Sequence, residues 1–224
     1  MLLHFVPVIR LPLIGNYLAE YILVSPIEKK SSYSVRIYIV RKSEHMSEKV
    51  NITPLGMQIL TFLARHPEQE FYIREIAQSI NKSVGGTHKT LKSLQTLNFV
   101  IEKKSGRNIY YRVDTTNPSV KNFKIFITTT ELNPFINDLK NISEKIILFG
   151  SCSIGDDTAS SDIDLFVLSH DNEKVKSYLN KKRSGRTIQA VVVNAAELVK
   201  LKEHDKAFYQ EINKGITLWE GRNE

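Results

Sequence analysis

Residues 145–168 have the sequence KIILFGSCSIGDDTASSDIDLFVL, and this stretch decides the fold of the C-terminal part of the chain. An apolar run ends in Gly150-Ser151, and after ten further residues Asp162 and Asp164 open a second apolar run. Short apolar runs bounded by turn residues are typical of buried strands. Glycine allows the backbone to approach a phosphate closely, and a serine hydroxyl beside backbone amides is able to bind it. Aspartates two residues apart on a strand project from one face, so they are placed to share a divalent ion.

The residues after this stretch continue to alternate between strand and helix patterns. Besides the strands at 145–149 and 162–168, we expect strands at 187–193 and 216–219 and helices at 172–182, 195–203 and 205–214. Gly215 is placed to end the last helix. Residues 145–224 are therefore expected to form an α/β or α+β domain in which helices flank a mixed sheet.

Taken together, the strand, Gly150-Ser151, the spacer and Asp162-Ile163-Asp164 resemble the minimal nucleotidyltransferase family of the polymerase-beta-like superfamily, over about residues 145–220. By this resemblance Gly150, Ser151 and Ser161 bind a nucleoside triphosphate, with ATP the expected one. Asp162 and Asp164 are then the catalytic residues and bind Mg²⁺ (or Mn²⁺), which bridges the phosphates. The resemblance implies transfer of a nucleoside monophosphate to a protein or nucleic-acid acceptor, with release of pyrophosphate.

One residue departs from the family pattern. Members that use a full two-metal scheme have a third carboxylate on a later strand, where it serves as metal ligand and as base for the acceptor hydroxyl. The matching strand here is 187–193, and the matching position is Gln189, which neither takes a proton nor supplies a charge. Either Asp156, Asp157 or the substrate itself activates the acceptor, or the domain binds nucleotide and transfers it slowly or not at all.

Four residues near the motif have simpler interpretations. Asp156 and Asp157 lie in the connecting loop and are best explained as a solvated turn. Arg186, close to the basic run 181–183, is expected at a solvated helix end rather than in contact with nucleic acid or triphosphate. Cys152 has no histidine at a suggestive position, so it is expected to be a small buried residue rather than a nucleophile.

The composition excludes several classes of protein. The chain has 224 residues, of which 42% are hydrophobic and 25% charged, as is usual for a soluble globular protein. Its single cysteine excludes an internal disulfide, and its six histidines lack ligand spacing, so a reducing cytoplasm is the expected location. The net charge is +7. Residues 51–113 hold nine Lys and Arg against four Glu, whereas residues 145–224 hold twelve charges of each sign, so a polyanion-binding module is expected in the front half.

Residues 46–113 have the pattern of such a module. Thr53 caps a helix that begins at Pro54 and stops before Pro67, and further helices are predicted at 73–80 and from Ser83 to about residue 98. Strands at 99–103 and 109–113 follow, joined by a turn at 104–108. This order resembles a winged helix-turn-helix DNA-binding domain. The residues of the third helix expected to face the core are Val84, Thr87 or His88, Leu91, Leu94 and Leu97.

Two parts of this domain are expected to contact DNA. Gly85 and Gly86 allow the third helix to approach the major groove, and the hairpin is expected to lie along the backbone or in the minor groove. The expected DNA-binding residues are Lys89, Thr90, Lys92, Ser93, Lys103, Lys104 and Arg107. The alternative is a domain that only contacts protein or forms a homodimer, which the charge of +5 over residues 51–113 disfavours.

Two segments lie outside these domains. Residues 1–45 form an N-terminal extension with a strand expected at 33–40; its apolar start is too interrupted for a membrane span, and it lacks the features of a secretory signal. We assign it no role and hypothesise that translation begins at Met46. Residues 114–144, which hold Asn117-Pro118 and Asn133-Pro134, are expected to be a partly helical linker.

The sequence supports two hypotheses of function. The first is a DNA-binding protein with a working nucleotidyltransferase domain, which modifies a partner protein or RNA as the antitoxins of this family do with their paired toxin. The second is a transcriptional regulator whose nucleotidyltransferase domain binds nucleotide without chemistry. The intact Gly150-Ser151 and Asp162/Asp164 favour the first, and Gln189 favours the second.

Overall fold

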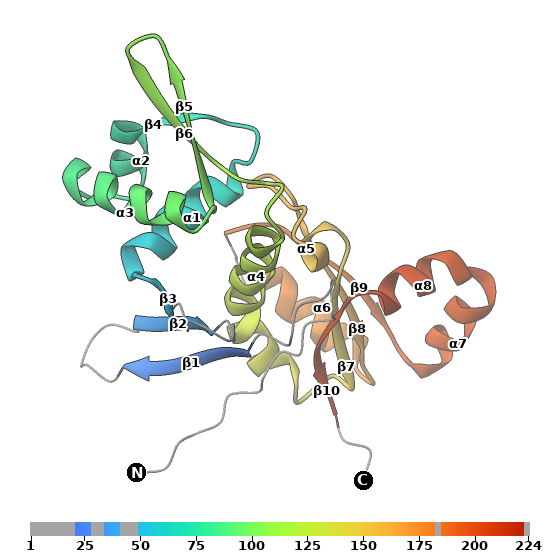
Figure 1. Ribbon diagram of the computed structural model, residues 1–224. Coiled ribbons are helices and arrows are strands. Elements are labelled where there is room, and N and C mark those ends of the chain that lie inside the picture. Colours follow the sequence, from blue (N-terminus) through green and yellow to red (C-terminus); the bar gives the residue numbers. More distant parts are fainter. Residues whose placement is uncertain (1–20, 28–33, 41–48, 182–184, 222–224) are drawn as a thin grey trace. The chain divides into compact units, whose positions relative to one another are not determined.

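A computed structural model describes residues 21–27, 34–40, 49–181 and 185–221 (Figure 1). The chain divides into two compact units. The first takes the described residues up to Phe62 together with Glu70–Tyr111, and the second takes Leu63–Gln69 and the residues from Arg112 onward. Among the described residues, no helix combines the length and apolar character that a membrane crossing requires. Met46 lies outside the described residues, so the hypothesis about the start of translation stays a prediction.

The N-terminal sheet of the first unit has three antiparallel strands, in the order β1 (Tyr21–Ile27), β2 (Ser34–Val40) and β3 (Lys49–Ile52). Strand β2 confirms the strand expected at 33–40. Strand β1 was not predicted; it contains Pro26, and proline gives no N–H to a ladder. The observed topology explains its presence, since β1 lies at the edge of the sheet, where a proline is tolerated.

The rest of the first unit has the winged-helix arrangement, in which three helices are followed by a hairpin. Its elements are α1 (Pro54–Arg65), β4 (Phe71–Tyr72), α2 (Ile73–Ser79), α3 (Val84–Thr96), β5 (Val100–Ser105) and β6 (Asn108–Val113), with the strand order β4-β6-β5. The predicted caps form as expected. Thr53 Oγ1 accepts from the Gly56 amide at 3.1 Å, and Ser83 Oγ accepts from the Gly86 amide at 3.2 Å. The last residues of α1, from Leu63, belong to the second unit.

The core face of α3 follows the predicted spacing with one exception. Thr87, Leu91 and Leu94 are buried and Leu97, at the C-cap, is half-buried, whereas Val84 is 44% exposed, so the assignment of Val84 to the core was wrong. Val84 is the first residue of the helix, directly after the cap. Apolar periodicity alone does not show where the core ends relative to a helix terminus.

The second unit is built on a four-stranded mixed sheet with the order β10-β7-β8-β9. Strands β8 and β9 are parallel, and the other pairs are antiparallel. The elements are α4 (Pro118–Leu139), β7 (Lys145–Phe149), α5 (Ser151–Ile154), β8 (Ile163–Leu168), α6 (Asn172–Lys181), β9 (Ile188–Val193), α7 (Ala195–His204), α8 (Lys206–Asn213) and β10 (Ile216–Glu220). All four strands lie where the sequence predicted them.

Helices cover both faces of this sheet. Alternate residues of β7 and β8 enter two separate cores, as the strand period of two requires. One core joins the sheet to α4 and α6 through Ile146, Leu148, Leu165, Leu132 and Val175. The other joins it to α8 and contains Ile147, Phe149, Phe166 and Ile212. The unit is therefore a three-layer α/β domain, which gives each residue near the sheet edge a defined face.

Most of the segment expected to be a linker is the 22-residue helix α4. Asn117 caps it, with Oδ1 accepting from the Ser119 amide at 2.9 Å, and Pro118 occupies the first turn. Pro134 lies inside the helix, where the sequence pattern suggested a break. Leu132, Phe135 and Leu139 pack into the core on one face of the sheet, and this burial outweighs the hydrogen bond that Pro134 removes.

Candidate nucleotide and metal site

Strand register brings the two halves of the Gly-Ser and Asp-x-Asp motif to one end of the sheet. Asp164 on β8 pairs with Phe149 on β7 and with Gln189 on β9. Because side chains alternate along a strand, Asp164 lies on the same face as Phe166, which is the face that packs against α8. Gly150 follows Phe149 directly, so the Gly-Ser turn begins beside Asp164.

Gly150 meets a conformational and a steric requirement at once. Its φ is +66°, in the left-handed half of backbone space, which favours glycine. A Cβ at this position would overlap Asp164 Oδ2 and lie 3.2 Å from Asp164 Cγ. Only glycine therefore allows the turn to lie against the carboxylate, and the two halves of the motif are in contact.

The two aspartates form an electrostatically unfavourable pair in the absence of a cation. Burial, and then the neighbouring Asp162 carboxylate, raise the pKa of Asp164 above its usual range. Asp162 itself is exposed. A divalent cation prefers carboxylate oxygens and would relieve both the burial of the Asp164 charge and its repulsion by Asp162. The side chains present therefore fit one divalent cation.

Gln189 lies on β9, within the strand that the sequence predicted, and the structure pairs it with Asp164 and makes it a hydrogen-bond donor. Its Nε2 donates to Asp162 Oδ2 at 3.3 Å. In the part of the chain that the structure describes, no group of three or more His, Cys, Asp or Glu side chains is arranged to hold a metal ion. The candidate site therefore has two carboxylates, and the Gln189 amide stands where the full two-metal scheme has a third carboxylate.

The two serines assigned to nucleotide binding differ in their surroundings. Ser151 is the first residue of α5, directly after Gly150, and its carbonyl accepts from the Asp156 amide at 3.0 Å. Ser161 Oγ accepts from the Thr158 amide at 2.9 Å, so this hydroxyl closes a turn within the connecting loop. Nucleotide binding by Ser151 and Ser161 stays a prediction, as does the catalytic role of Asp162 and Asp164.

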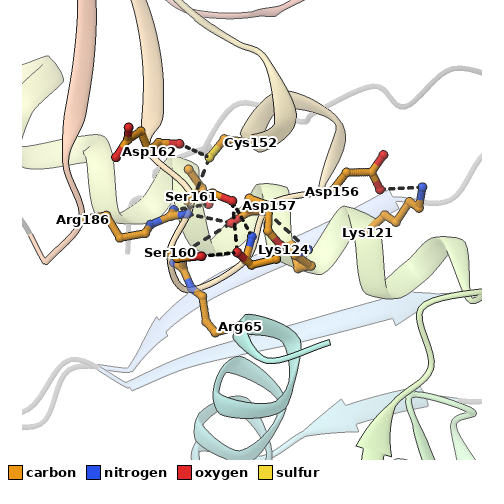
Figure 2. Close-up of polar contacts among 12 residues, drawn as sticks. Arg65, Lys121, Lys124, Cys152, Asp156, Asp157, Ser160, Ser161, Asp162 and Arg186 are labelled. Atoms are coloured by element: carbon orange, nitrogen blue, oxygen red, sulfur yellow. Dashed lines mark hydrogen bonds and ion pairs between the residues drawn. The ribbon is translucent and has the colours of Figure 1, made fainter. Parts of the chain in front are cut away.

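Asp157, in the connecting loop, is the centre of a buried ionic cluster that the sequence analysis did not predict. Asp157, expected in a solvated turn, is 1% exposed, and Arg186, expected at a solvated helix end, is 9% exposed. Both expectations were wrong. Arg186 Nη1 donates to Asp157 Oδ2 at 2.7 Å, and Arg65 Nη1 lies 3.4 Å from the same oxygen (Figure 2). Asp156, by contrast, is exposed and pairs with Lys121 at 2.7 Å, as a solvated turn allows.

Helix α4 supplies the other members of this cluster. Lys124 is 8% exposed; its Nζ donates to the Asp157 carbonyl and lies 3.6 Å from Asp157 Oδ1. Burial lowers the pKa of Lys124, and the Asp157 charge opposes that effect. Glu131 accepts from Arg65 through both carboxylate oxygens, at 2.6 and 2.7 Å. Asp157 and the three cations around it, which are far apart in sequence, offset one another's charges, and this permits their burial, whereas Glu131 is 47% exposed.

Cys152 joins the Gly-Ser turn to the Asp-x-Asp strand. Its side chain is fully buried, as expected, and Sγ donates to the Asp162 carbonyl at 3.3 Å. Burial raises the pKa of the thiol, and nearby Asp157 adds to the effect. A buried thiol with a raised pKa is a poor nucleophile. The geometry therefore agrees with a packing role for Cys152.

The residues expected to contact DNA are found on α3 and on the β5–β6 hairpin of the first unit. Lys89, Ser93, Lys104 and Arg107 are exposed, whereas Thr90 is half-buried and donates to the Gly86 carbonyl at 2.9 Å. Two of the lysines form ion pairs within the unit. Lys92 lies 2.7 Å from Glu102, and Lys103 lies 2.9 Å from Glu70. Contact of these residues with DNA stays a prediction.

Comparison with known families gives one match, and it lies within the second unit. Residues 130–224 match the family model described as "Polymerase beta, Nucleotidyltransferase". No curated protein matches the chain.

The solved structures with partial similarity come from two bacteria. A mutant of ZitR from Lactococcus lactis is 22% identical with a TM-score of 0.33, covering 46% of this chain and 68% of that one. Wild-type ZitR in complex with DNA is 20% identical with a TM-score of 0.31, covering 45% and 64%. Adhesin competence repressor AdcR from Streptococcus pyogenes is 21% identical with a TM-score of 0.34, covering 46% and 74%. The winged-helix assignment made above rests on the order of its helices and strands and not on these similarities.

Proposed function

We propose that this chain transfers a nucleoside monophosphate from a nucleoside triphosphate to an acceptor, because residues 130–224 match the polymerase beta nucleotidyltransferase family model. The observation that carries the proposal is the contact between Gly150 and the Asp164 carboxylate. Two parts of a motif separated by a ten-residue spacer meet at the end of the sheet, with Asp162 exposed beside them.

The proposed roles follow from this arrangement. Asp162 and Asp164 hold Mg²⁺ or Mn²⁺, which when bound supplies positive charge that offsets the charge of the triphosphate. The Gly150-Ser151 turn binds the phosphates through its backbone and the serine hydroxyl. The acceptor hydroxyl attacks the α-phosphorus and forms a new P–O bond, while the bond from the α-phosphorus to the oxygen that bridges it to the β-phosphorus breaks. Pyrophosphate leaves with that oxygen, and the hydroxyl proton passes to solvent. The acceptor is a protein or an RNA, as in an antitoxin that modifies its partner, and ATP is the first nucleotide to test.

The first unit is proposed to bind DNA. The charge excess of residues 51–113 and the exposed Lys89, Lys104 and Arg107 on the helix and hairpin of a winged helix support this role. Several cations on one module give a salt-dependent attraction to any duplex before bases are read.

Transfer is tested with Mg²⁺ and radiolabelled ATP, CTP, GTP and UTP, added to the protein together with lysate of the host. The matched control is the double variant Asp162→Asn/Asp164→Asn, which keeps side-chain size and removes both charges. We expect label on one acceptor band or RNA with the wild type and none with the control. Equal labelling by both proteins with every nucleotide would falsify the transfer activity.

A second candidate function is nucleotide sensing without transfer. It is favoured by the hydrogen bond from Gln189 Nε2 to Asp162, since an amide in that position takes no proton from an acceptor. In this case Mg²⁺-dependent nucleotide binding is present and labelling is absent. Calorimetric titration of nucleotide, run beside the labelling experiment, separates the two functions.

A further inference from the structure

The loop between the Gly-Ser turn and Asp162 is attached to α4 at successive residues. Gly155, with φ +73°, lies so close to Lys121 that a Cβ there would overlap the Lys121 backbone. Asp156 pairs with the Lys121 side chain, and the Asp157 carbonyl accepts from Lys124 (Figure 2). The loop therefore has one defined path, and that path determines where Asp162 begins its strand.

Arg186 is the side chain that connects this loop to Cys152, whose Sγ donates to the Asp162 carbonyl. It lies two residues before β9, on which Gln189 is found. Its Nη1 donates to Asp157 Oδ2 at 2.7 Å and lies 3.6 Å from the sulfur of Cys152, the residue after Ser151. Its Nη2 donates to Thr128 Oγ1 on α4 at 2.9 Å. One guanidinium thus contacts α5, the connecting loop and α4.

The contacts of Arg186 with Asp157 and Thr128 require two N–H donors held in one plane. A guanidinium presents several N–H donors in a fixed plane, so Nη1 and Nη2 serve Asp157 and Thr128 at the same time. A lysine ammonium supplies the charge without the fixed geometry. Asp157 Oδ1 is buried without a hydrogen bond, so the carboxylate depends on the surrounding cations for its burial.

We propose that Arg186 is a positioning residue of the nucleotide site, which holds Asp157 and Cys152 so that the Gly150-Ser151 turn and the Asp162/Asp164 pair stay together. This inference rests on the proposed function of the site. Arg186 acts through these neighbours, from the α4 side of the sheet. Outer contacts that orient metal-binding groups affect affinity strongly, although they touch neither metal nor substrate.

The test compares full-length Arg186→Gln and Arg186→Lys with wild type, and uses Lys121→Gln as matched control. Lys121→Gln removes the exposed ion pair to Asp156 in the same loop. Binding of fluorescent ATP is measured with and without Mg²⁺, at a temperature where circular dichroism shows every variant folded. Arg186→Gln is expected to weaken Mg²⁺-dependent binding roughly 10- to 100-fold. The affinity of Arg186→Lys is expected to lie between those of the wild type and Arg186→Gln. Lys121→Gln is expected to stay within about twofold, because exposed pairs contribute little.

A double variant separates positioning from stability alone. Arg186→Gln leaves Asp157 with a weakened set of cations and lowers the melting temperature, whereas Asp157→Asn/Arg186→Gln removes both members of the pair and recovers much of that loss. Nucleotide binding is expected to stay weak in the double variant, because the contacts with Thr128 and Cys152 are still missing. Amide hydrogen exchange across residues 155–162 is expected to be faster in both variants than in Lys121→Gln.

Each outcome decides the inference. Wild-type affinity in folded Arg186→Gln, or affinity that recovers together with the melting temperature in the double variant, overturns it and leaves the proposed function standing. Absence of Mg²⁺-dependent binding in the wild type itself overturns both. If neither Arg186→Gln nor Arg186→Lys folds, Arg186 is a stability residue and the positioning role is rejected. Weak binding, a recovered melting temperature and faster loop exchange in the double variant support the inference.

Discussion

At the scale of single residues, Gly150 is the position where fold and proposed chemistry are most tightly linked. Gly150→Ala adds a methyl group that overlaps the Asp164 carboxylate, at a φ that alanine rarely adopts. We expect a loss of about 1–3 kcal/mol of stability from the backbone strain, more if Asp164 is displaced, and at least about tenfold weaker Mg²⁺-dependent nucleotide binding. Thermal denaturation and nucleotide titration measure the two effects.

The control for this variant is Gly185→Ala. Gly185 has open space around its Cβ position and no positive φ, so the same substitution there should leave both measurements unchanged. Equal effects of the two substitutions would show that the contact with Asp164 is unimportant.

A substitution at Gln189 is expected to lower the melting temperature without a cation and to increase the stabilisation that a bound cation gives. Gln189→Glu keeps the size of the side chain, replaces the donor to Asp162 by a third negative charge and removes the hydrogen bond. Without metal we expect a lower melting temperature, because like charges repel. With Mg²⁺ we expect a larger thermal shift than in the wild type and about tenfold tighter cation binding, since affinity grows with the number of charged ligands. Thermal shift over a Mg²⁺ titration measures both, and Gln189→Ala, which gains no charge, should show no tightening.

The two charged residues whose burial the sequence analysis misjudged, Asp157 and Arg186, share one property, which is that their partners are remote in sequence. Gly150, Ser151, Asp162 and Asp164 belong to a local motif with a fixed spacer, so the sequence alone is enough to predict them as site residues. Asp157 is 33 residues from Lys124 and 29 from Arg186, so nothing near it distinguishes it from its exposed neighbour Asp156. Burial of a charge depends on tertiary partners, and no local pattern reports those.

At the scale of elements, the helices and strands with strong periodicity and clear caps were predictable. The N-termini of α1 and α3, capped by Thr53 and Ser83, lie where capping chemistry placed them. Helix α4 was less predictable, because Pro134 and an apolar surface on several sides obscured its period. Its continuity depends on packing against the sheet, which the sequence of the helix alone does not contain.

The ion pair between α3 and the hairpin gives a pH prediction for the first unit. The hydrogen bond from Lys92 holds the pKa of Glu102 below its usual range, so this pair stabilises the fold above the unfolded pKa of about 4.3. The contribution is lost as pH falls through the lowered pKa. Glu102→Gln should therefore melt below the wild type near neutral pH, and this difference should disappear on acidification. A difference that persists at a pH well below the lowered pKa, in melting curves recorded across pH, contradicts the assignment.

At the scale of the whole molecule, the net positive charge is concentrated in one part of the chain and absent from another. The net +5 of residues 51–113 belongs mostly to the first unit, whereas residues 145–224 are neutral overall. A uniform distribution would suggest a general role in solubility. Concentration of cations on a winged helix favours nucleic acid as its partner, because released counterions drive such binding.

This division predicts how DNA affinity depends on salt. We expect binding to duplex DNA to weaken by at least about tenfold between 50 and 200 mM salt, and Lys89→Ala to reduce the slope of log K against log salt by roughly one. Lys89 is exposed on α3 and has no acidic partner comparable to Glu102 beside Lys92 among the ion pairs found in the described part of the chain. Lys206→Ala, an equal change of charge at the start of α8 in the second unit, is the control and should leave the slope unchanged. Equal slopes for wild type and Lys89→Ala in a mobility-shift titration would remove α3 from the DNA contact, and an effect of Lys206→Ala alone would move that contact to the second unit.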